Sequence, residues 1–169
     1  MASLAGWRFC PRCGSPLEVS AGRAECSSCG SISYAQSAAA ASAFVVENGK
    51  VLLGRRAHEP DADRWDLLGG FLEEGEHPLA GLRRELLEET GLDVEPGEFL
   101  GSYLDTYGEL GTTVLNLVFE ARIVSGEMVA ADDVAELRWF DLDGLPARED
   151  LAFRWVSRFF DDLKSSAPA

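Results

Sequence analysis

Residues 70–92 read GFLEEGEHPLAGLRRELLEETGL, and this stretch predicts a single helix with clear ends. Pro78 suits the first turn of a helix, and Gly91 suits the residue just after its last turn. Four leucines recur at helical spacing between these two positions and predict one apolar face: Leu79, Leu82, Leu86 and Leu87.

Three glutamates of the same helix, Glu85, Glu88 and Glu89, stand at i, i+3 and i+4 and share one face. A solvated acidic face paired with arginines is common, and the neighbouring Arg84 fits that interpretation. A purely structural helix, however, gains nothing from like charges this close together. A divalent cation that prefers hard oxygen ligands would turn this repulsion between carboxylates into shared attraction to the metal. The pattern therefore predicts a binding site for Mg²⁺ or Mn²⁺.

The complete stretch resembles the Nudix box, the signature of the Nudix hydrolase superfamily. The signature runs Gly, five residues, Glu, seven residues, then Arg-Glu-apolar-x-Glu-Glu-x-Gly-apolar. Every specified position is filled here, by Gly70, Glu76, Arg84, Glu85, Leu86, Glu88, Glu89, Gly91 and Leu92. The resemblance implies an α/β fold, the Nudix α/β/α sandwich with a mixed sheet, and the activity of a pyrophosphatase.

The resemblance also implies a set of metal ligands and a set of catalytic residues. Glu85, Glu88 and Glu89 would bind the Mg²⁺ or Mn²⁺ ions, together with the Gly70 carbonyl and with Glu73. Arg84 would act in catalysis by holding the box carboxylates in place. The general base would be a box glutamate, Glu89 or Glu85, or an acid of a later loop: Asp132, Asp133 or Glu136.

Candidate substrate contacts lie on both sides of the box. Residues 43–47 and 50–54 flank Asn48-Gly49 and predict a hairpin, which Arg55 and Arg56 follow. Both arginines are candidates for binding phosphate, although arginines on edge strands often only face solvent. Phe71 and Tyr107 are candidates for substrate binding. For Tyr107, an equal alternative is that the ring packs at the edge of the core.

Two Cys-x-x-Cys pairs at the N-terminus, Cys10/Cys13 and Cys26/Cys29, predict a metal site. Four thiolates within reach of a tetrahedron suit one structural Zn²⁺, with iron as the main alternative. Two disulfides are disfavoured because no secretory signal precedes them, and a redox motif would not need two copies. We expect the segment to be a small zinc ribbon that depends on its metal for folding.

The ribbon divides the chain into two expected domains, residues 1–36 and residues 37–169. An alanine-rich stretch, residues 36–42, is interpreted as a linker that runs into a strand. The ribbon carries three arginines and two glutamates, which is too little positive charge for a nucleic-acid-binding surface. A folded stub or a contact between the subunits of a homodimer is the preferred role.

The rest of the chain mixes strands with one more helix. Residues 99–104, 112–124 and 137–140 are typical of strands. Residues 149–164 predict a helix whose apolar residues recur at helical spacing, and we assign these to the core: Leu151, Trp155, Val156, Phe159, Phe160 and Leu163.

Composition excludes several classes of protein. The chain has 169 residues and a formal net charge of −14, which disfavours nucleic-acid binding. No apolar run approaches the roughly 18 residues of a membrane helix. The N-terminal residues lack the charged start and long apolar run of a secretory signal, so we expect a cytoplasmic protein.

A zinc ribbon ahead of a Nudix box resembles the subgroup of NADH, FAD and ADP-ribose pyrophosphatases. NADH pyrophosphatases carry a Ser-Gln-Pro-Trp-Pro-Phe-Pro-like signature after the box, where residues 103–108 here read YLDTYG. We therefore expect a small-molecule nucleotide substrate, ADP-ribose or an ADP-containing dinucleotide such as FAD. NADH and RNA 5′ ends are alternative substrates, and a non-catalytic nucleotide sensor is the alternative outside the enzymes.

Overall fold

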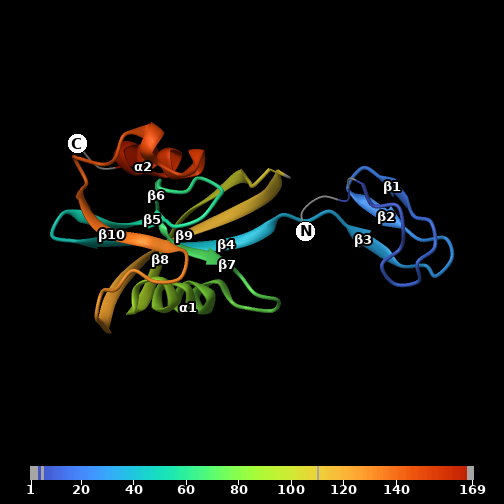
Figure 1. The fold of residues 1–169 in the computed structure, drawn as a ribbon, viewed down its shortest axis with the longest axis horizontal. Helices are drawn as coiled ribbons and strands as arrows, with labels where there is room; N and C mark the ends of the chain where they lie inside the picture. The colour runs from blue at the N-terminus through green and yellow to red at the C-terminus, as the bar shows by residue number, and fades with distance from the viewer. Residues whose placement is uncertain (1–3, 5, 110, 167–169) are drawn as a thin grey trace.

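The main body of the molecule is a mixed β-sheet between two helices (Figure 1). The computed structural model describes residues 4, 6–109 and 111–166. Helix α1 (Pro78–Thr90) covers one face of the sheet, and helix α2 (Arg154–Ser166) covers the other. This arrangement confirms the expected α/β/α sandwich.

The strands follow the order β10-β5-β4-β9-β8, with two short strands attached to its centre. Strand β4 pairs in parallel with β9, whereas its pairings with β5 and β7 are antiparallel, so the sheet is mixed. The bounds are β4 (Ala38–Glu47), β5 (Lys50–Arg56), β6 (Trp65–Asp66), β7 (Leu68–Phe71), β8 (Leu92–Tyr107), β9 (Thr112–Gly126) and β10 (Val134–Asp141).

Local sequence signals set two of the boundaries. Asn48 and Gly49 both have positive φ, 51° and 76°, and join β4 to β5 in the predicted hairpin. Helix α1 begins at Pro78, with His77 as its N-cap, and ends before Gly91, whose φ of 69° terminates it. The helix bounds therefore confirm the sequence prediction.

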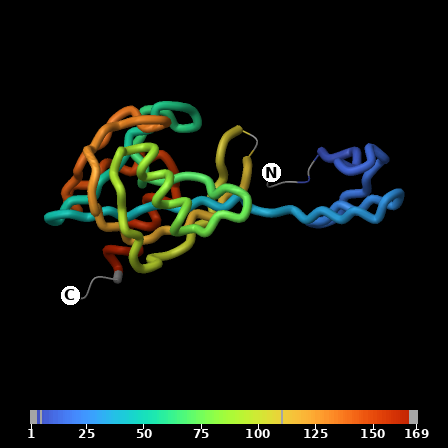
Figure 2. The backbone as a smooth tube through the Cα atoms, turned by 90° about the horizontal axis from the view of Figure 1, so that it is seen from below, coloured from blue at the N-terminus to red at the C-terminus, as the bar shows by residue number. Residues whose placement is uncertain are grey.

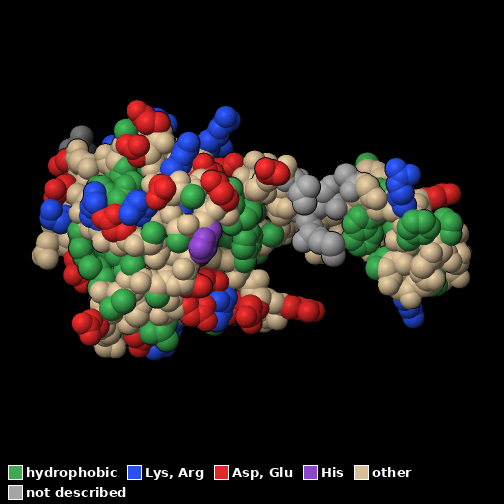
Figure 3. Space-filling view, in the orientation of Figure 1, with side chains coloured by type: hydrophobic (Ala, Val, Ile, Leu, Met, Phe, Trp, Pro, Cys, Tyr) green, Lys and Arg blue, Asp and Glu red, His purple; other side chains and the backbone are tan. Residues whose placement is uncertain are grey.

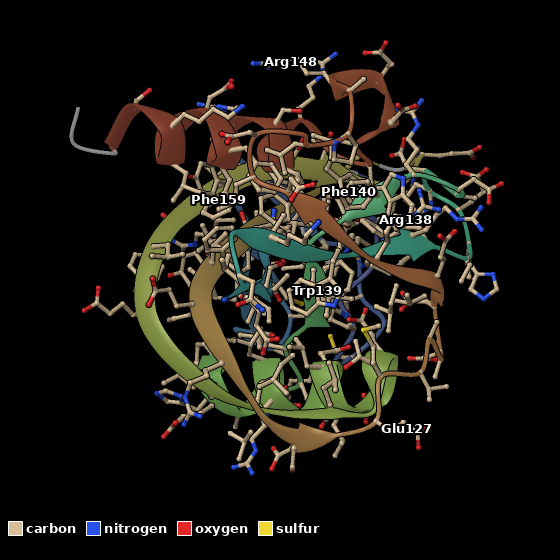
Figure 4. The ribbon with its side chains drawn as sticks, turned by 90° about the vertical axis from the view of Figure 1, so that its left-hand side faces the viewer. Glu127, Arg138, Trp139, Phe140, Arg148 and Phe159 are labelled. Atoms are coloured by element: carbon tan, nitrogen blue, oxygen red, sulfur yellow. The ribbon has the colours of Figure 1, made fainter. Side chains whose placement is uncertain are left out.

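The side chains of the sheet alternate between two cores. On β4, Ala41, Ala43 and Val45 belong to the core beneath α1, whereas Phe44 packs toward α2. Figure 4 shows the same alternation on β10, where Trp139 and Phe140 point to opposite faces of the sheet. Each helix therefore has an apolar core of its own.

The α2 core confirms the packing role predicted for the C-terminal aromatic residues. Trp155, Phe159 and Phe160 are at most 4% exposed, and Phe44 packs edge-on against Phe159 with ring centroids 5.2 Å apart. On α1, Leu82 and Leu86 are fully buried, but Leu87 is 52% exposed. The prediction that Leu87 belongs to the apolar face was wrong, because this side chain lies on the solvent side of the helix.

Two expected boundaries need correction. Residues 38–42, interpreted as linker, form the first half of β4, and Ala41 is completely buried. The backbone of this segment lies close to Gly69 of β7: a Cβ atom at Gly69 would lie 2.2 Å from the Ala41 carbonyl oxygen. The last helix begins at Arg154 and not at residue 149, because the Ala152 N–H donates to the Trp65 carbonyl and keeps the chain extended.

The N-terminal ribbon is a separate three-stranded antiparallel sheet that lies apart from the main body (Figures 1 and 2). Its strands are β1 (Glu18–Ser20), β2 (Arg23–Glu25) and β3 (Ile32–Tyr34). The backbone N–H groups of Gly14 and Gly30 donate to the carbonyls of Cys10 and Cys26, so the two Cys-x-x-Cys loops have the same turn.

The four thiols of the ribbon form one cluster and are all free. Their sulfur atoms lie within 4.8 Å of one another, with Cys10 and Cys29 separated by 3.7 Å and Cys13 and Cys26 by 3.6 Å. A tetrahedron with Zn–S bonds of about 2.3 Å has edges of about 3.8 Å. The cluster is therefore compatible with one bound Zn²⁺.

Among the described residues, neither helix is long and apolar enough to cross a bilayer.

Substitution of the buried Cys26 tests this metal site. We expect a Cys26→Ser variant to lose its zinc, from one ion per chain to none, because a hydroxyl replaces one of four thiolate ligands. Elemental analysis of the purified protein gives the zinc content, and limited proteolysis shows whether residues 1–36 unfold. The exposed neighbour Ser27 provides the control, because Ser27→Ala leaves the thiols intact. A protein that holds its zinc after Cys26→Ser contradicts the assignment.

Candidate metal and nucleotide site

The carboxylates of α1 meet the backbone of β7 where that strand carries two glycines. The Gly69 N–H donates to the Glu89 carboxylate at 2.8 Å. A Cβ atom placed on Gly70 would lie 2.6 Å from the Glu85 carboxyl carbon, so any side chain there would occupy the space of the carboxylate. The glycine pair therefore lets two of the predicted metal ligands reach the edge of the sheet.

Arg84 forms hydrogen bonds with three glutamates of the box. Its guanidinium donates twice to Glu76, at 2.9 Å each, and also to Glu85 at 2.8 Å and Glu88 at 3.1 Å. The hydrogen bonds from Arg84 lower the pKa of Glu76 to about 2. Figure 3 shows acidic and basic side chains together along the loop before α1. Arg84 therefore orients carboxylates, the role that the family resemblance implies for it.

Glu89 is the buried member of the cluster, with 5% of its surface exposed. Burial raises its pKa well above the usual range, and the nearby carboxylates of Asp133 and Glu85 act in the same direction. Burial also raises the pKa of Glu85. Carboxylates held this close and partly out of water repel one another unless a cation or proton is added. Carboxylate oxygens are the hard ligands that Mg²⁺ and Mn²⁺ prefer, so Glu85 and Glu89 are candidates for binding such a cation.

Two of the predicted metal ligands lie at the edge of this cluster. Glu88 is exposed and hydrogen-bonds with Arg84. Glu73 is also exposed, and its backbone N–H donates to Glu76 at 3.0 Å. Their roles as metal ligands remain predictions.

A cavity of about 200 Å³ lies beside the carboxylates and brings most of the other predicted residues together. Its lining consists of Ala40, Ser42, Arg56, Asp66, Leu67, Gly69, Gly70, Phe71, Glu85, Tyr107, Val114, Asn116, Asp132, Asp133, Phe153 and Trp155. The lining residues come from both sides of the sheet: Glu85 belongs to α1, and Trp155 belongs to α2. Both loop acids, Asp132 and Asp133, are part of it.

Arg56 forms one wall of the cavity. Its guanidinium carbon lies 5.1 Å from the centroid of the Phe153 ring and 5.8 Å from that of Tyr107. Its Nε donates to the Pro60 carbonyl at 2.8 Å, and its Nη1 lies 3.7 Å from the Asp66 carboxylate. Burial outweighs this ion pair and raises the pKa of Asp66 to about 7.

Arg55 and Glu136 are not among the residues that line this cavity. Arg55 donates to Glu136 at 3.0 Å and to Asp63 at 2.8 Å. Glu136 also accepts a hydrogen bond from Arg138, and these contacts lower its pKa. The structure therefore places Arg56, Asp132 and Asp133 at the cavity, and places Arg55 and Glu136 in a separate ion-pair network on the neighbouring strands.

Sequence reasoning missed several residues that line the cavity. Trp155 was assigned to the core of the last helix, Phe153 was given no role, and Ser42 was hidden in the alanine-rich stretch. Asn116 offered a usable signal, because it is a polar residue inside the apolar run of β9. Asp66 offered another, because it is a charged residue just before the two leucines that lead into Gly69-Gly70.

Comparisons with known proteins agree with this geometry. The model of the NUDIX domain family matches residues 36–162. An ADP-ribose pyrophosphatase of Methanocaldococcus jannaschii is 34% identical over 113 residues, which cover 67% of each chain. An NAD-capped RNA hydrolase NudC of Pseudomonas aeruginosa is 31% identical over 92% of this chain and 55% of its own length. The chain thus spans about half the length of the NAD-capped RNA hydrolases that it matches.

A solved structure covers the ribbon as well as the main body. A NUDIX hydrolase from Nitrosomonas europaea superimposes with a TM-score of 0.76 and 27% identity, over 96% of both chains. This likeness includes both parts of the chain.

Gly70→Ala tests the close approach of the carboxylates. The new methyl group would occupy the position of the Glu85 carboxylate, so we expect the affinity for Mn²⁺ to fall about 10- to 100-fold. Titration followed by electron paramagnetic resonance measures this affinity. Gly144→Ala is the matched control, since a Cβ atom there makes only ordinary contacts. Unchanged Mn²⁺ binding in Gly70→Ala would show that Glu85 is not a ligand.

Glu76→Gln tests the contribution of the Arg84 network to stability. The pKa of Glu76 is lowered in the folded state, so its contribution is complete above the unfolded-state pKa of about 4.5 and is lost as the pH falls toward 2. We expect the variant to melt at a lower temperature than the parent at pH 7, and the difference to shrink as the pH falls from about 5 to about 3. Glu74→Gln, in the same loop, should melt like the parent. A melting difference that does not depend on pH would contradict this assignment.

Proposed function

The chain belongs to the NUDIX domain family and is a Nudix hydrolase, and from this premise we propose that it hydrolyses the diphosphate bond of ADP-ribose or of an ADP-containing dinucleotide such as FAD. The observation that carries the proposal is the shared cavity, in which an aromatic and arginine wall meets the Glu85 carboxylate of the box and the loop acids Asp132 and Asp133. A nucleotide with a base at one end and a diphosphate at the other matches these two halves.

We assign the metal site to the Glu85 and Glu89 carboxylates, with Glu88, Glu73 and the Gly70 carbonyl as further ligands. A bound Mg²⁺ or Mn²⁺ ion polarises the phosphoryl group and lowers the pKa of the attacking water. The carboxylates keep the site strongly negative, which disfavours binding of a diphosphate without a cation. This accounts for how a chain with a net charge of −14 handles an anionic substrate.

In the proposed reaction the oxygen of water forms a bond to one phosphorus, and the bond from that phosphorus to the bridging oxygen breaks. The bridging oxygen leaves with the electron pair as part of the second phosphate. One proton of the water goes to a carboxylate. Glu89 suits this role because burial raises its pKa and the adjacent Asp133 acts in the same direction, so it accepts a proton more readily than an exposed carboxylate. ADP-ribose would give AMP and ribose 5-phosphate.

The cavity residues would hold the nucleoside part of the substrate. The Phe71 ring is 41% exposed and meets Tyr107 edge-on, with centroids 5.2 Å apart. An exposed ring surface of this kind can stack on a base. Arg56 is held in place by the Pro60 carbonyl and by two aromatic rings, so it can present N–H groups to an anionic or polar substrate group.

A second candidate is the hydrolysis of NADH or of nucleotide-capped RNA 5′ ends. It is favoured by the NAD-capped RNA hydrolases, whose matches to this chain are longer than that of the ADP-ribose pyrophosphatase. The sequence YLDTYG at residues 103–108 and the acidic surface count against it. A non-catalytic sensor is disfavoured because all glutamates of the box are present. The homodimer and the domain boundary after residue 36 remain proposals.

A substrate panel with a Glu89→Gln variant tests the proposal. We expect the parent protein with Mg²⁺ to convert ADP-ribose to AMP and ribose 5-phosphate faster than it cleaves FAD, NADH or NAD-capped RNA. In Glu89→Gln we expect kcat to fall by about 100-fold or more, because the carboxylate near the reacting atoms is lost. Mass spectrometry identifies the products.

Glu98→Gln makes the same chemical change at an exposed position on β8 and serves as the control. Faster cleavage of NADH or capped RNA would move the assignment to the second candidate. No turnover of any of the four substrates by folded, metal-loaded protein would contradict the proposed activity.

A further inference from the structure

Four polar side chains are buried among the described residues: Ser42, Glu89, Thr90 and Asn116. Two of them have partners that explain their burial. Glu89 accepts from the Gly69 N–H, and the Thr90 hydroxyl donates to the Leu86 carbonyl and accepts from the Leu92 N–H. Ser42 and Asn116 remain, at 4% and 6% exposed, and both line the cavity.

These two side chains point to the same face of the sheet. Ala41 and Ala43 belong to the α1 core, so Ser42 between them points toward the α2 side. Asn116 shares its face with Val118, which belongs to the α2 core. Strands β4 and β9 pair in parallel, with Ala40 opposite Asn116 and Ser42 opposite Val118. Ser42 and Asn116 therefore lie on adjacent strands and form a polar floor beneath the aromatic walls.

The hydrogen bonds leave one acceptor directed at the cavity. The Asn116 Nδ2 donates to the Tyr103 carbonyl at 3.4 Å, a long hydrogen bond that assigns Nδ2 to this side of the amide and Oδ1 to the other. In the part of the chain that the structure describes, the Asn116 Oδ1 and the Ser42 hydroxyl have no hydrogen-bond partner. Among the described residues the one buried side-chain nitrogen or oxygen atom without a partner is the Arg23 Nε, so the Asn116 and Ser42 oxygens are accessible, and both residues line the cavity. A ligand group in the cavity can supply the missing partner.

We infer that Asn116 and Ser42 are specificity-determining residues that read the polar edge of a purine base. This inference rests on the proposed function and deepens it. The Asn116 Oδ1 accepts a hydrogen bond from an amino group, and the Ser42 hydroxyl can pair with a neighbouring ring nitrogen. The exocyclic amino group of adenine supplies the donor. Hypoxanthine carries a carbonyl oxygen at that position and would face Oδ1 with a second acceptor.

The arrangement selects adenine because the amide cannot reverse without loss of its bond to Tyr103. A site built to pair with a donor discriminates against a ligand that lacks it, because its own buried acceptor is left unpaired. The cavity of about 200 Å³ is smaller than the roughly 300 Å³ at which pockets for whole drug-sized ligands begin. It therefore encloses the base, while the diphosphate lies over the carboxylates.

Binding of the mononucleotides AMP and IMP to the full chain tests this inference without turnover. We expect the parent protein to bind AMP about tenfold more tightly than IMP in calorimetry with Mg²⁺ present. In Asn116→Leu, which keeps the volume and removes the acceptor, we expect the two affinities to agree within about threefold. Ser42→Ala should weaken AMP binding with little change in fold. Ser125 is exposed on β9, the strand that carries Asn116, and the control variant Ser125→Ala should behave like the parent.

The steady-state kinetics of ADP-ribose and its hypoxanthine analogue separate this inference from the proposed activity. Selectivity for AMP that disappears in Asn116→Leu supports the polar floor, even if ADP-ribose is not hydrolysed. Hydrolysis of ADP-ribose with equal kcat/KM for both analogues in the parent, or with selectivity unchanged in Asn116→Leu, would overturn it while the activity stands. If Asn116→Leu does not fold, Ser42→Ala and the comparison of AMP with IMP in the parent decide the outcome.

Discussion

The close contact between helix α1 and strand β7 is the constraint on which the site depends. A carboxylate can lie against the sheet edge only where the strand has no side chain, and Gly69 and Gly70 provide that space. Leu82 and Leu86 of the same helix are fully buried in the core between α1 and the sheet, and this packing holds the helix in place. The apolar packing of α1 and the position of its charged groups are thus two results of one helix geometry, with its period of 3.6 residues.

Electrostatics divides the acidic residues of the site into two groups. The outer group pairs with Arg84, and Glu76 is held ionised by it. The inner group is Glu89, which lies next to Asp133. Among the described residues the Gly69 N–H is its one hydrogen-bond donor, and burial raises its pKa well above the usual range. The outer pairing gives the loop its shape, whereas the inner repulsion creates the demand for a cation. An arginine near the inner group would satisfy its charge and remove the affinity for metal.

The sequence predicted what depends on local chemistry and missed what depends on packing. The ends of α1 and the β4–β5 hairpin follow from Pro78, Gly91 and Asn48-Gly49, which act on their own neighbours. The first half of β4 was missed because its alanines carry no strand signal of their own, and the segment is held as a strand by its pairing with β7 and β9, which are tertiary contacts. Arg55 and Arg56 are adjacent in a strand and point to opposite faces, so only the finished sheet could show which one lines the cavity. Trp155 could not be recognised as a cavity residue, because its spacing is the same as that of the core residues of α2.

The placement of the cavity between the two helices has a consequence for how this protein can diverge. The groups proposed for bond cleavage come from α1 and the glycine pair, whereas the polar groups proposed for base recognition come from β4 and β9. Strand β7 contributes to both, because Phe71 directly follows Gly70, but Ser42 and Asn116 lie on other strands. Single substitutions on one side of the sheet can therefore alter which nucleotide is accepted while the hydrolytic apparatus is inherited unchanged. One scaffold can in this way give rise to a lineage of enzymes with the same reaction and different substrates.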